Sequence, residues 1–209
     1  MGRPRLHSPD AVLDVAELLA AEGGPAAVTI RAVAERSGAS TGSLYHAFPS
    51  REAILAAMWL RAARRFLALQ RAAVDAALAA GGRDAPVAAT LAAAMTLRDL
   101  QRDHPASARL LTTQRREALL TADVPAELAD ALRGLDGELL ALLRSLARAL
   151  WERADRVAVE TVAVCVVDLP TAMLVPRRPQ AIDTAPLLEA AVRATLAVPL
   201  PPPSTRARR

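Results

Sequence analysis

The segment 29–51, TIRAVAERSGASTGSLYHAFPSR, constrains the fold of this chain more than any other stretch. Apolar residues at Ile30, Val33 and Ala34 have helical spacing, and they predict a short helix that packs on a core. Gly38 follows the last turn of that helix, where a left-handed backbone conformation costs a glycine little. The chain is therefore expected to turn there and to enter a second helix.

Hydroxyl side chains mark the starts of both helices. Thr29 precedes the first helix and either Ser40 or Thr41 precedes the second, so each can accept a hydrogen bond from a free backbone N–H. The second helix holds Leu44, Ala47 and Phe48 on one side. Two short helices joined by a tight turn form a helix-turn-helix, whose second helix enters the major groove of DNA.

The second helix carries the candidate DNA contacts. With Leu44 and Phe48 facing the core, Tyr45 is expected to turn outward and to offer its hydroxyl to a phosphate; a partly buried ring is the alternative. Gly42 costs about 1 kcal/mol relative to Ala inside a helix, and close approach of the backbone to DNA is the reason we favour. His46 contacts a phosphate or is an ordinary surface side chain. The predicted DNA-binding residues are Thr29, Arg31, Ser40, Thr41, Gly42, Ser43, Tyr45, His46 and Arg51.

These residues also carry a family resemblance. The runs Gly38-Ala39-Ser40, Leu44-Tyr45-His46 and Pro49-Ser50-Arg51-Glu52, with Gly42 and Phe48, resemble the tetracycline-repressor-like (TetR/AcrR) family of bacterial transcription regulators. The resemblance is specific over residues 8–55 and extends beyond them only to length and a helical pattern. Arg51 stands where the family usually has Lys, which keeps the cation and implies a phosphate clamp. Ala47 stands where a larger aromatic or His side chain is common, so no contact is assigned there.

The remaining chain predicts helices throughout. Ser8-Pro9-Asp10 begins a helix with an N-cap, a proline at the first position and an acid in the first turn. Helical spacing of apolar residues continues over 50–80, 85–102, 106–112, 125–151, 157–175 and 185–198, and Gly134 and Gly137 indicate close packing or a soft point. We predict an all-α protein with an N-terminal three-helix helix-turn-helix DNA-binding domain, residues 1–51. A larger helical effector-binding and dimerisation domain, residues 52–198, and a disordered tail, residues 199–209, complete the chain.

Charge supports a polyanionic partner only weakly. The net charge is +4 and all 26 basic residues are Arg, yet residues 1–50 hold four arginines against five carboxylates. Affinity for DNA would have to come from placed contacts and from Arg51, Arg61, Arg64 and Arg65 just after this region. Arg3 and Arg5 either reach into a minor groove or belong to a solvated terminus.

Residues 157–175 form the most hydrophobic stretch, VAVETVAVCVVDLPTAMLV. Its length approaches that of a membrane span, but Glu160, Asp168 and Pro170 argue against one, because acids in mid-span are costly. We predict a dimer helix that pairs with residues 185–198 and forms a four-helix interface in a homodimer, without a membrane partner. The predicted interface residues are Val157, Thr161, Val164, Asp168, Leu187 and Ala191.

Several kinds of site have no sequence signature here. His7, His46 and His104 lack metal-ligand spacing, and no nucleophile elbow, P-loop or dinucleotide fingerprint occurs, so we predict no cofactor, no metal and no enzyme activity. The single cysteine, Cys165, excludes an internal disulfide, fits a reducing cytoplasm and is expected to be inert packing. The start of the chain lacks the apolar run of a signal peptide, and a nucleoid-associated cytoplasmic location follows.

The resemblance implies a ligand-responsive transcriptional regulator, a homodimer that binds an inverted-repeat operator on double-stranded DNA and represses transcription. A small, apolar effector would release it. Four of the five aromatic residues precede residue 67, so the pocket would have aliphatic walls that suit an acyl ligand. Candidate pocket residues are Trp59, Phe66, Met95, Arg98, His104 and Trp151. Two alternatives remain: a helical scaffold whose helix-turn-helix binds protein, and a helical enzyme whose catalytic cluster is assembled by folding.

Overall fold

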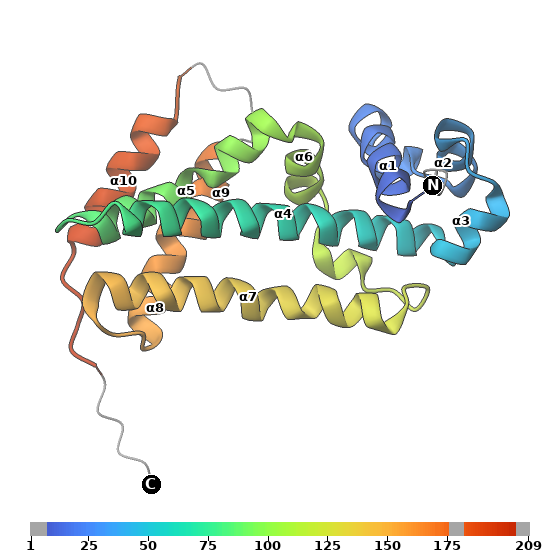
Figure 1. Cartoon of the computed structure of the whole chain (residues 1–209). Helices are drawn as coiled ribbons and strands as arrows, with labels where there is room; N and C mark the ends of the chain where they lie inside the picture. The colour runs from blue at the N-terminus through green and yellow to red at the C-terminus, as the bar shows by residue number, and fades with distance from the viewer. Residues whose placement is uncertain (1–7, 176–181, 204–209) are drawn as a thin grey trace, which may run out of the picture. The chain divides into compact units, whose positions relative to one another are not determined.

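The computed structural model describes residues 8–175 and 182–203, and within these ranges it contains helices and no strand, which confirms the predicted all-α class. The described residues pack into two compact units. Unit 1 comprises residues up to 65 and residues 100–135, and unit 2 comprises residues 66–99 and those from 136 onward. The α-helices are α1 (Pro9–Gly23), α2 (Ile30–Ser37), α3 (Thr41–Ala47), α4 (Arg51–Ala79), α5 (Ala85–Asp103), α6 (Pro105–Thr113), α7 (Ala126–Trp151), α8 (Arg156–Ala163), α9 (Leu169–Leu174) and α10 (Ala185–Ala197) (Figure 1).

The N-cap hydrogen bonds predicted at the helix starts are present. The Ser8 hydroxyl accepts from the backbone N–H of Ala11, and the Thr29 hydroxyl accepts from that of Ala32 at 3.0 Å. Of the two candidates for the second helix, Ser40 is the cap: its Oγ accepts from the N–H of Ser43 at 3.1 Å. Gly38 has φ = 70°, so the turn between α2 and α3 uses the left-handed conformation that the glycine predicted.

Unit 1 has one apolar core beneath the helix-turn-helix. Leu44 is 1% exposed, and it packs with Phe48, with α1 residues such as Val12 and with Ile54 and Met58 of α4. Leu110 of α6 and Leu119 of the 3-10 turn Arg116–Leu119 belong to the same cluster, and α6 packs directly on α1. The helix-turn-helix therefore does not have a core of its own: residues 100–135 complete it.

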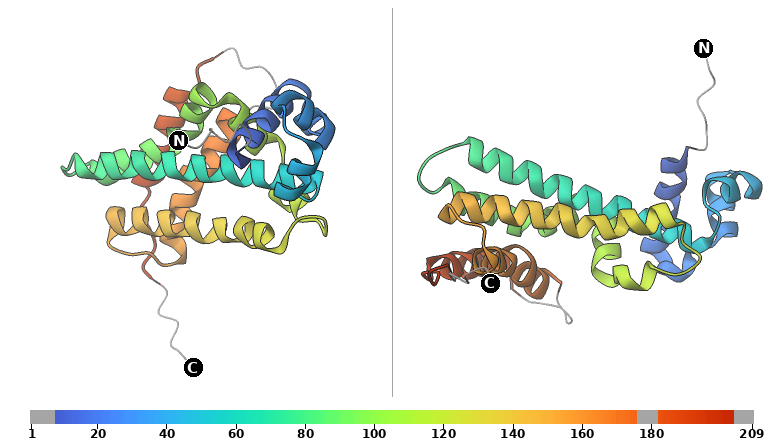
Figure 2. Two further views of the ribbon diagram at one scale, coloured as in Figure 1. Left: turned by 45° about the vertical axis from the view of Figure 1, so that its right-hand side comes forward. Right: turned by 90° about the horizontal axis from the view of Figure 1, so that it is seen from below.

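Unit 2 has a separate core of small and aliphatic side chains. It contains Ala89 and Ala93 of α5, Leu142, Leu146 and Ala147 of α7, and a stripe from residues 156–174 and α10, with Val162, Cys165, Leu188 and Val192 fully buried. The helices α9 and α10 lie side by side in this unit (Figure 2). Leu200 packs against the same core, and the Arg153 guanidinium donates to the carbonyl of Pro201, so residues 199–203 of the predicted tail are held in place.

The apolar stretch 157–175 is helical but irregular. A π-helical segment, Val164–Asp168, separates α8 from α9 where a single α-helix was predicted. Pro170 explains this: proline has no N–H to donate, and its ring would meet the carbonyl of Val166 in an unbroken α-helix. The wider turn relieves that clash.

The prediction of close packing at Gly134 and Gly137 is wrong. A Cβ placed at either position would meet no neighbouring atom within 4 Å. Both glycines lie inside α7 with ordinary backbone conformations, so they lower helix propensity without permitting any close approach.

The predicted division after residue 51 falls at the first residue of α4, whereas the compact units divide within α4, α5 and α7. The assignment of DNA binding to residues 1–51 and of effector binding to residues 52–198 stays a prediction. Arg3, Arg5, His7 and residues 204–209 lie outside the described residues.

Candidate nucleic-acid interface

Helix α3 presents a polar face to solvent. Leu44 and Phe48 point into the core of unit 1, while Tyr45 is 53% exposed, as its position predicted. The exposed residues on and just before this helix are Ser40, Thr41, Gly42, Ser43, Tyr45, His46 and Ala47. The prediction that Ala47 shares the inner side with Leu44 and Phe48 is therefore wrong, because Ala47 lies one residue before Phe48 and turns to solvent. A Cβ at Gly42 would meet nothing within 4 Å, so this glycine leaves a short stretch of backbone uncovered on the outer face. Small hydroxyls, one phenol and exposed backbone are groups that bind phosphate and base edges.

The hydroxyl groups that cap α2 and α3 keep a free donor. Thr29 and Ser40 each accept a backbone N–H through the hydroxyl oxygen, which leaves the hydroxyl proton to donate elsewhere. Both side chains are therefore fixed in orientation and still able to donate to a phosphate.

Carboxylates already pair with the described arginines of the first fifty residues. Arg31 contacts Glu35 at 2.8 Å on the exposed side of α2, and Arg36 contacts both oxygens of Glu22 at 2.6 and 2.7 Å. The hydrogen bond from Arg36 lowers the pKa of Glu22 below its usual value. A DNA phosphate would have to displace Glu35 from Arg31 before it could contact this predicted DNA-binding side chain.

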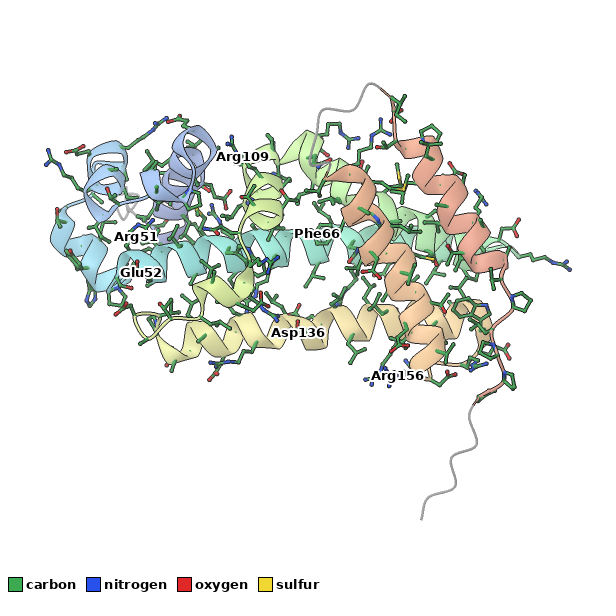
Figure 3. All side chains as sticks on the ribbon, turned by 180° about the vertical axis from the view of Figure 1, so that it is seen from behind. Arg51, Glu52, Phe66, Arg109, Asp136 and Arg156 are labelled. Atoms are coloured by element: carbon green, nitrogen blue, oxygen red, sulfur yellow. The ribbon has the colours of Figure 1, made fainter. Side chains whose placement is uncertain are left out.

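Arg51 has partners within the fold. Its Nε donates to the carbonyl of Val28 and its Nη2 to that of Pro25, both at 2.7 Å, while Nη1 lies 3.3 Å from Glu52. Figure 3 shows Arg51 and Glu52 next to each other at the start of α4. The side chain joins α4 to the turn that precedes α2, and its contact with phosphate stays a prediction.

Sequence reasoning missed a buried ionic network in unit 1. Glu17 of α1 is 8% exposed, and its Oε1 accepts from Nε and Nη2 of Arg61 at 3.0 and 2.8 Å. Its Oε2 accepts from the Ser107 hydroxyl at 3.1 Å and lies 3.4 Å from Nη1 of Arg65, which donates to Ser107 at 2.6 Å. The network joins α1, α4 and α6, so the expectation that Arg61 and Arg65 supply DNA affinity is wrong: both turn inward.

One signal could have revealed that network. Glu17 occupies a helical position within the apolar stripe of Leu13, Ala16 and Ala20, where a carboxylate is costly unless paired. The partner on α6, Ser107, is ninety residues away and has no sequence signature.

The six candidate pocket residues fall into both units. Trp59 and His104 are in unit 1, where the Trp59 Nε1–H donates to the carbonyl of Gln114 and His104 immediately precedes α6. Phe66, Met95 and Trp151 pack against the core of unit 2, and Arg98 pairs with Asp183 at 3.5 Å. Three hollows in unit 1, of about 220, 130 and 260 Å³, are lined by other residues. The pocket assignment stays a prediction.

The predicted dimer residues are all exposed or half-buried in unit 2. Val157 and Val164 are each 37% exposed and Leu187 is 48% exposed, with Asp168 also exposed and Thr161 and Ala191 half-buried. Among the described residues, the helical run Arg156–Leu174 is long and apolar enough to cross a membrane by length and composition, and 28% of its most apolar window is buried. Glu160 and Asp168 interrupt its exposed face. A single helix of this kind is weak evidence for a span.

Other chemistry is sparse in the part of the chain that the structure describes. No group of three His, Cys, Asp or Glu side chains there is arranged to hold a metal ion. Burial raises the pKa of the Cys165 thiol to about 11, so the sulfur is protonated at neutral pH and a poor nucleophile.

Comparison with known proteins agrees with this interface. Residues 12–58 match the sequence model of the bacterial regulatory proteins of the tetR family, a range that contains α2, α3 and the start of α4. No curated protein matches the chain in sequence.

Solved structures resemble the whole fold. The transcriptional regulator FadR from Bacillus subtilis, in complex with stearoyl-CoA, has a TM-score of 0.63 at 15% identity over 91% of this chain and 98% of its own. A bacterial regulatory protein of the tetR family from Rhodococcus gives 0.63 at 17% identity, over 93% and 96%. The ketosteroid transcriptional regulator of Mycobacterium tuberculosis gives 0.58 at 19% identity, over 90% and 92%.

Residues 12–58 thus match the helix-turn-helix region of bacterial regulatory proteins of the tetR family, and the fold is similar to that of solved transcriptional regulators. Both findings confirm the resemblance to the tetR family.

Proposed function

We propose that this chain is a ligand-responsive repressor that binds an inverted-repeat operator as a homodimer and is released by a small, apolar effector. The observation that carries the proposal is the face of α3: exposed Thr41, Gly42, Ser43, Tyr45 and His46 stand on a helix whose inner residues are buried. A helix anchored in this way can enter a major groove without losing core contacts.

The homodimer is proposed from exposed apolar side chains of unit 2. Exposed Val157, Val164 and Leu187 are apolar side chains on helices that are otherwise well packed, and a twin copy would cover them. A two-fold dimer presents two α3 helices to successive major grooves, roughly 34–36 Å apart, and therefore prefers two inverted half-sites.

The effector site is proposed in the aliphatic core of unit 2. A ligand bound there more tightly in a conformation that does not fit DNA shifts the protein away from the operator. The similar FadR structure holds stearoyl-CoA, and another similar protein is a ketosteroid regulator, so apolar effectors occur on this fold. A cytoplasmic location follows from the DNA partner.

The experiment is selection of binding duplexes from a random DNA library by the full-length protein. The proposal predicts enrichment of an inverted repeat and loss of binding as salt rises, because phosphate contacts release counterions. A protein-binding scaffold or an enzyme would enrich no sequence at any salt concentration, with or without cell extract as a source of effector.

The dimer is tested separately with Val164→Glu and Leu187→Glu, which place charges on the proposed interface. Leu140→Glu is the matched control, because Leu140 is 37% exposed on α7. The mass in solution should fall from dimer to monomer for the first two variants alone. Monomeric wild-type protein at micromolar concentration would contradict the dimer.

A further inference from the structure

The core of unit 2 contains a buried polar side chain that the fold leaves half satisfied. Gln70 of α4 is 1% exposed. Its Nε2 donates to the backbone carbonyl of Ala93 at 3.1 Å, which fixes the orientation of the amide. Its Oε1 is buried and has no hydrogen-bond partner among the described residues. Buried carbonyl oxygens are nearly always paired, so this acceptor requires an explanation.

The neighbouring polar groups cannot supply the missing donor. Thr90 and Thr96, also fully buried, stand three residues on either side of Ala93 on α5, and each hydroxyl donates to a carbonyl of its own helix. Their oxygens therefore offer only acceptor lone pairs. Cys165 carries a weak S–H donor, and the Arg153 guanidinium is held at the turn after α7 by Asp155 and Pro201. The Nη2 of Arg153 is also buried without a partner among the described residues, but it makes no hydrogen bond to Oε1 of Gln70, so this acceptor stays unpaired.

An apolar residue would pack at position 70 without this cost. The residues around Gln70 on the same face of α4 are Phe66, Leu67 and Val74, and across from it α5 offers Ala89 and Ala93. Leucine or methionine would suit such surroundings better than an amide with an unpaired oxygen. The unpaired oxygen of the amide lowers the stability of the unliganded fold, although the Nε2 hydrogen bond to Ala93 offsets part of that cost.

We propose that Gln70 is the polar anchor of the effector site and that the effector is an aliphatic molecule carrying a hydrogen-bond donor, such as a hydroxyl group. The donor pairs with Oε1 of Gln70, while the chain packs among the alanine, valine and leucine side chains of unit 2. This inference rests on the proposed ligand response and narrows its chemistry. A ligand that brings only a carbonyl or carboxylate oxygen to this point would face Oε1, Thr90 and Thr96 with no donor to share.

The test uses the full-length protein with two probes, 1-decanol and 1-methoxydecane, in which a methyl group replaces the hydroxyl hydrogen and so removes the donor. Calorimetric titration of the wild type should give at least about tenfold tighter binding of the alcohol, since a donor that pairs a buried acceptor typically contributes that much. Gln70→Met, which keeps the length and removes the acceptor, should reduce the two affinities to parity. Gln114→Met, at a half-buried position in unit 1, is the control and should retain the discrimination.

The fold of the variant is checked by thermal unfolding. Without ligand, Gln70→Met should melt about 2–6 °C higher than wild type, because an unpaired buried acceptor has been removed. Equal affinities of the two probes for wild type, binding of neither probe, or discrimination that survives in Gln70→Met would each overturn the inference. The DNA selection described above uses no probe, so its result does not depend on Gln70. A failed probe test would overturn only the role of Gln70, whereas a failed DNA selection would overturn the proposed regulator.

Discussion

The two units bury polar groups in opposite ways. Unit 1 encloses a carboxylate, Glu17, and satisfies it with Arg61 and Ser107 from two other helices, with Arg65 close by. Unit 2 encloses an amide, Gln70, whose oxygen remains unpaired within an aliphatic core. Directional ionic hydrogen bonds specify one arrangement of helices, whereas aliphatic packing tolerates several. The difference fits the roles proposed above, in which unit 1 holds a reading helix in one position and unit 2 adapts to a ligand.

The largest expected effect is in unit 1. Glu17→Ala leaves Arg61 and Arg65 partly buried without their shared carboxylate, and we expect the free energy of unfolding to fall by about 2–4 kcal/mol. Asp14 lies 2.9 Å from Arg61 and limits the loss. Urea unfolding measures it, with Glu22→Ala as control because Glu22 makes an exposed ion pair with Arg36. Similar losses in the two variants would show that the buried network has no special role.

Much of unit 1 could be predicted from sequence because its signals are local. The cap at Thr29, a hydroxyl cap at position 40 or 41, the glycine at 38 and the inward side chains Leu44 and Phe48 all depend on residues within one turn of each other. The ion pairs of Arg61 and Arg65 could not be predicted, because their partners on α1 and α6 meet only in the folded chain. The π-helical segment before Pro170 was missed for another reason: a proline predicts a break, but not whether the chain kinks or widens.

A smaller effect distinguishes the two hydroxyls that sequence alone left equivalent. Ser40→Ala removes the cap of α3 and should destabilise unit 1 by about 1 kcal/mol. Thr41→Ala, at an exposed position that makes no cap, should leave the unfolding midpoint unchanged. Urea unfolding measures the stability of both variants. An equal loss of stability in the two would contradict the assignment of Ser40 as the N-cap.

Acid affects unit 2 through Asp155, the N-cap of α8. The hydrogen bond from Arg153, supported by the backbone N–H of Ala158, lowers the pKa of Asp155 to about 2. A depressed folded-state pKa gives stability that is present above the ordinary value near 3.8 and is lost as pH falls through about 2. Asp155→Asn keeps a capping oxygen and removes the charge. The melting-temperature difference from wild type should vanish below pH 2, and a difference independent of pH would contradict this account.

The labelling rate of Cys165 does not change the fold and shows how closed the core of unit 2 is. Because burial raises the pKa of this thiol to about 11, a maleimide at pH 7 should label the native protein at least a hundredfold more slowly than the urea-unfolded chain. The rate is followed by mass spectrometry. Rapid labelling of the native protein would mean that unit 2 opens readily, and its core would then be less well packed than the burial of Cys165 indicates.

The central claim is that the exposed face of α3 reads DNA, and one binding measurement tests it most directly. Fluorescence anisotropy on the selected duplex compares wild type with Tyr45→Ala and with Leu18→Ala, a control that removes an equally exposed side chain, 49% against 53%, from α1. The account predicts at least about tenfold weaker binding for Tyr45→Ala alone, with unchanged melting temperatures. Equal binding by all three proteins would contradict it.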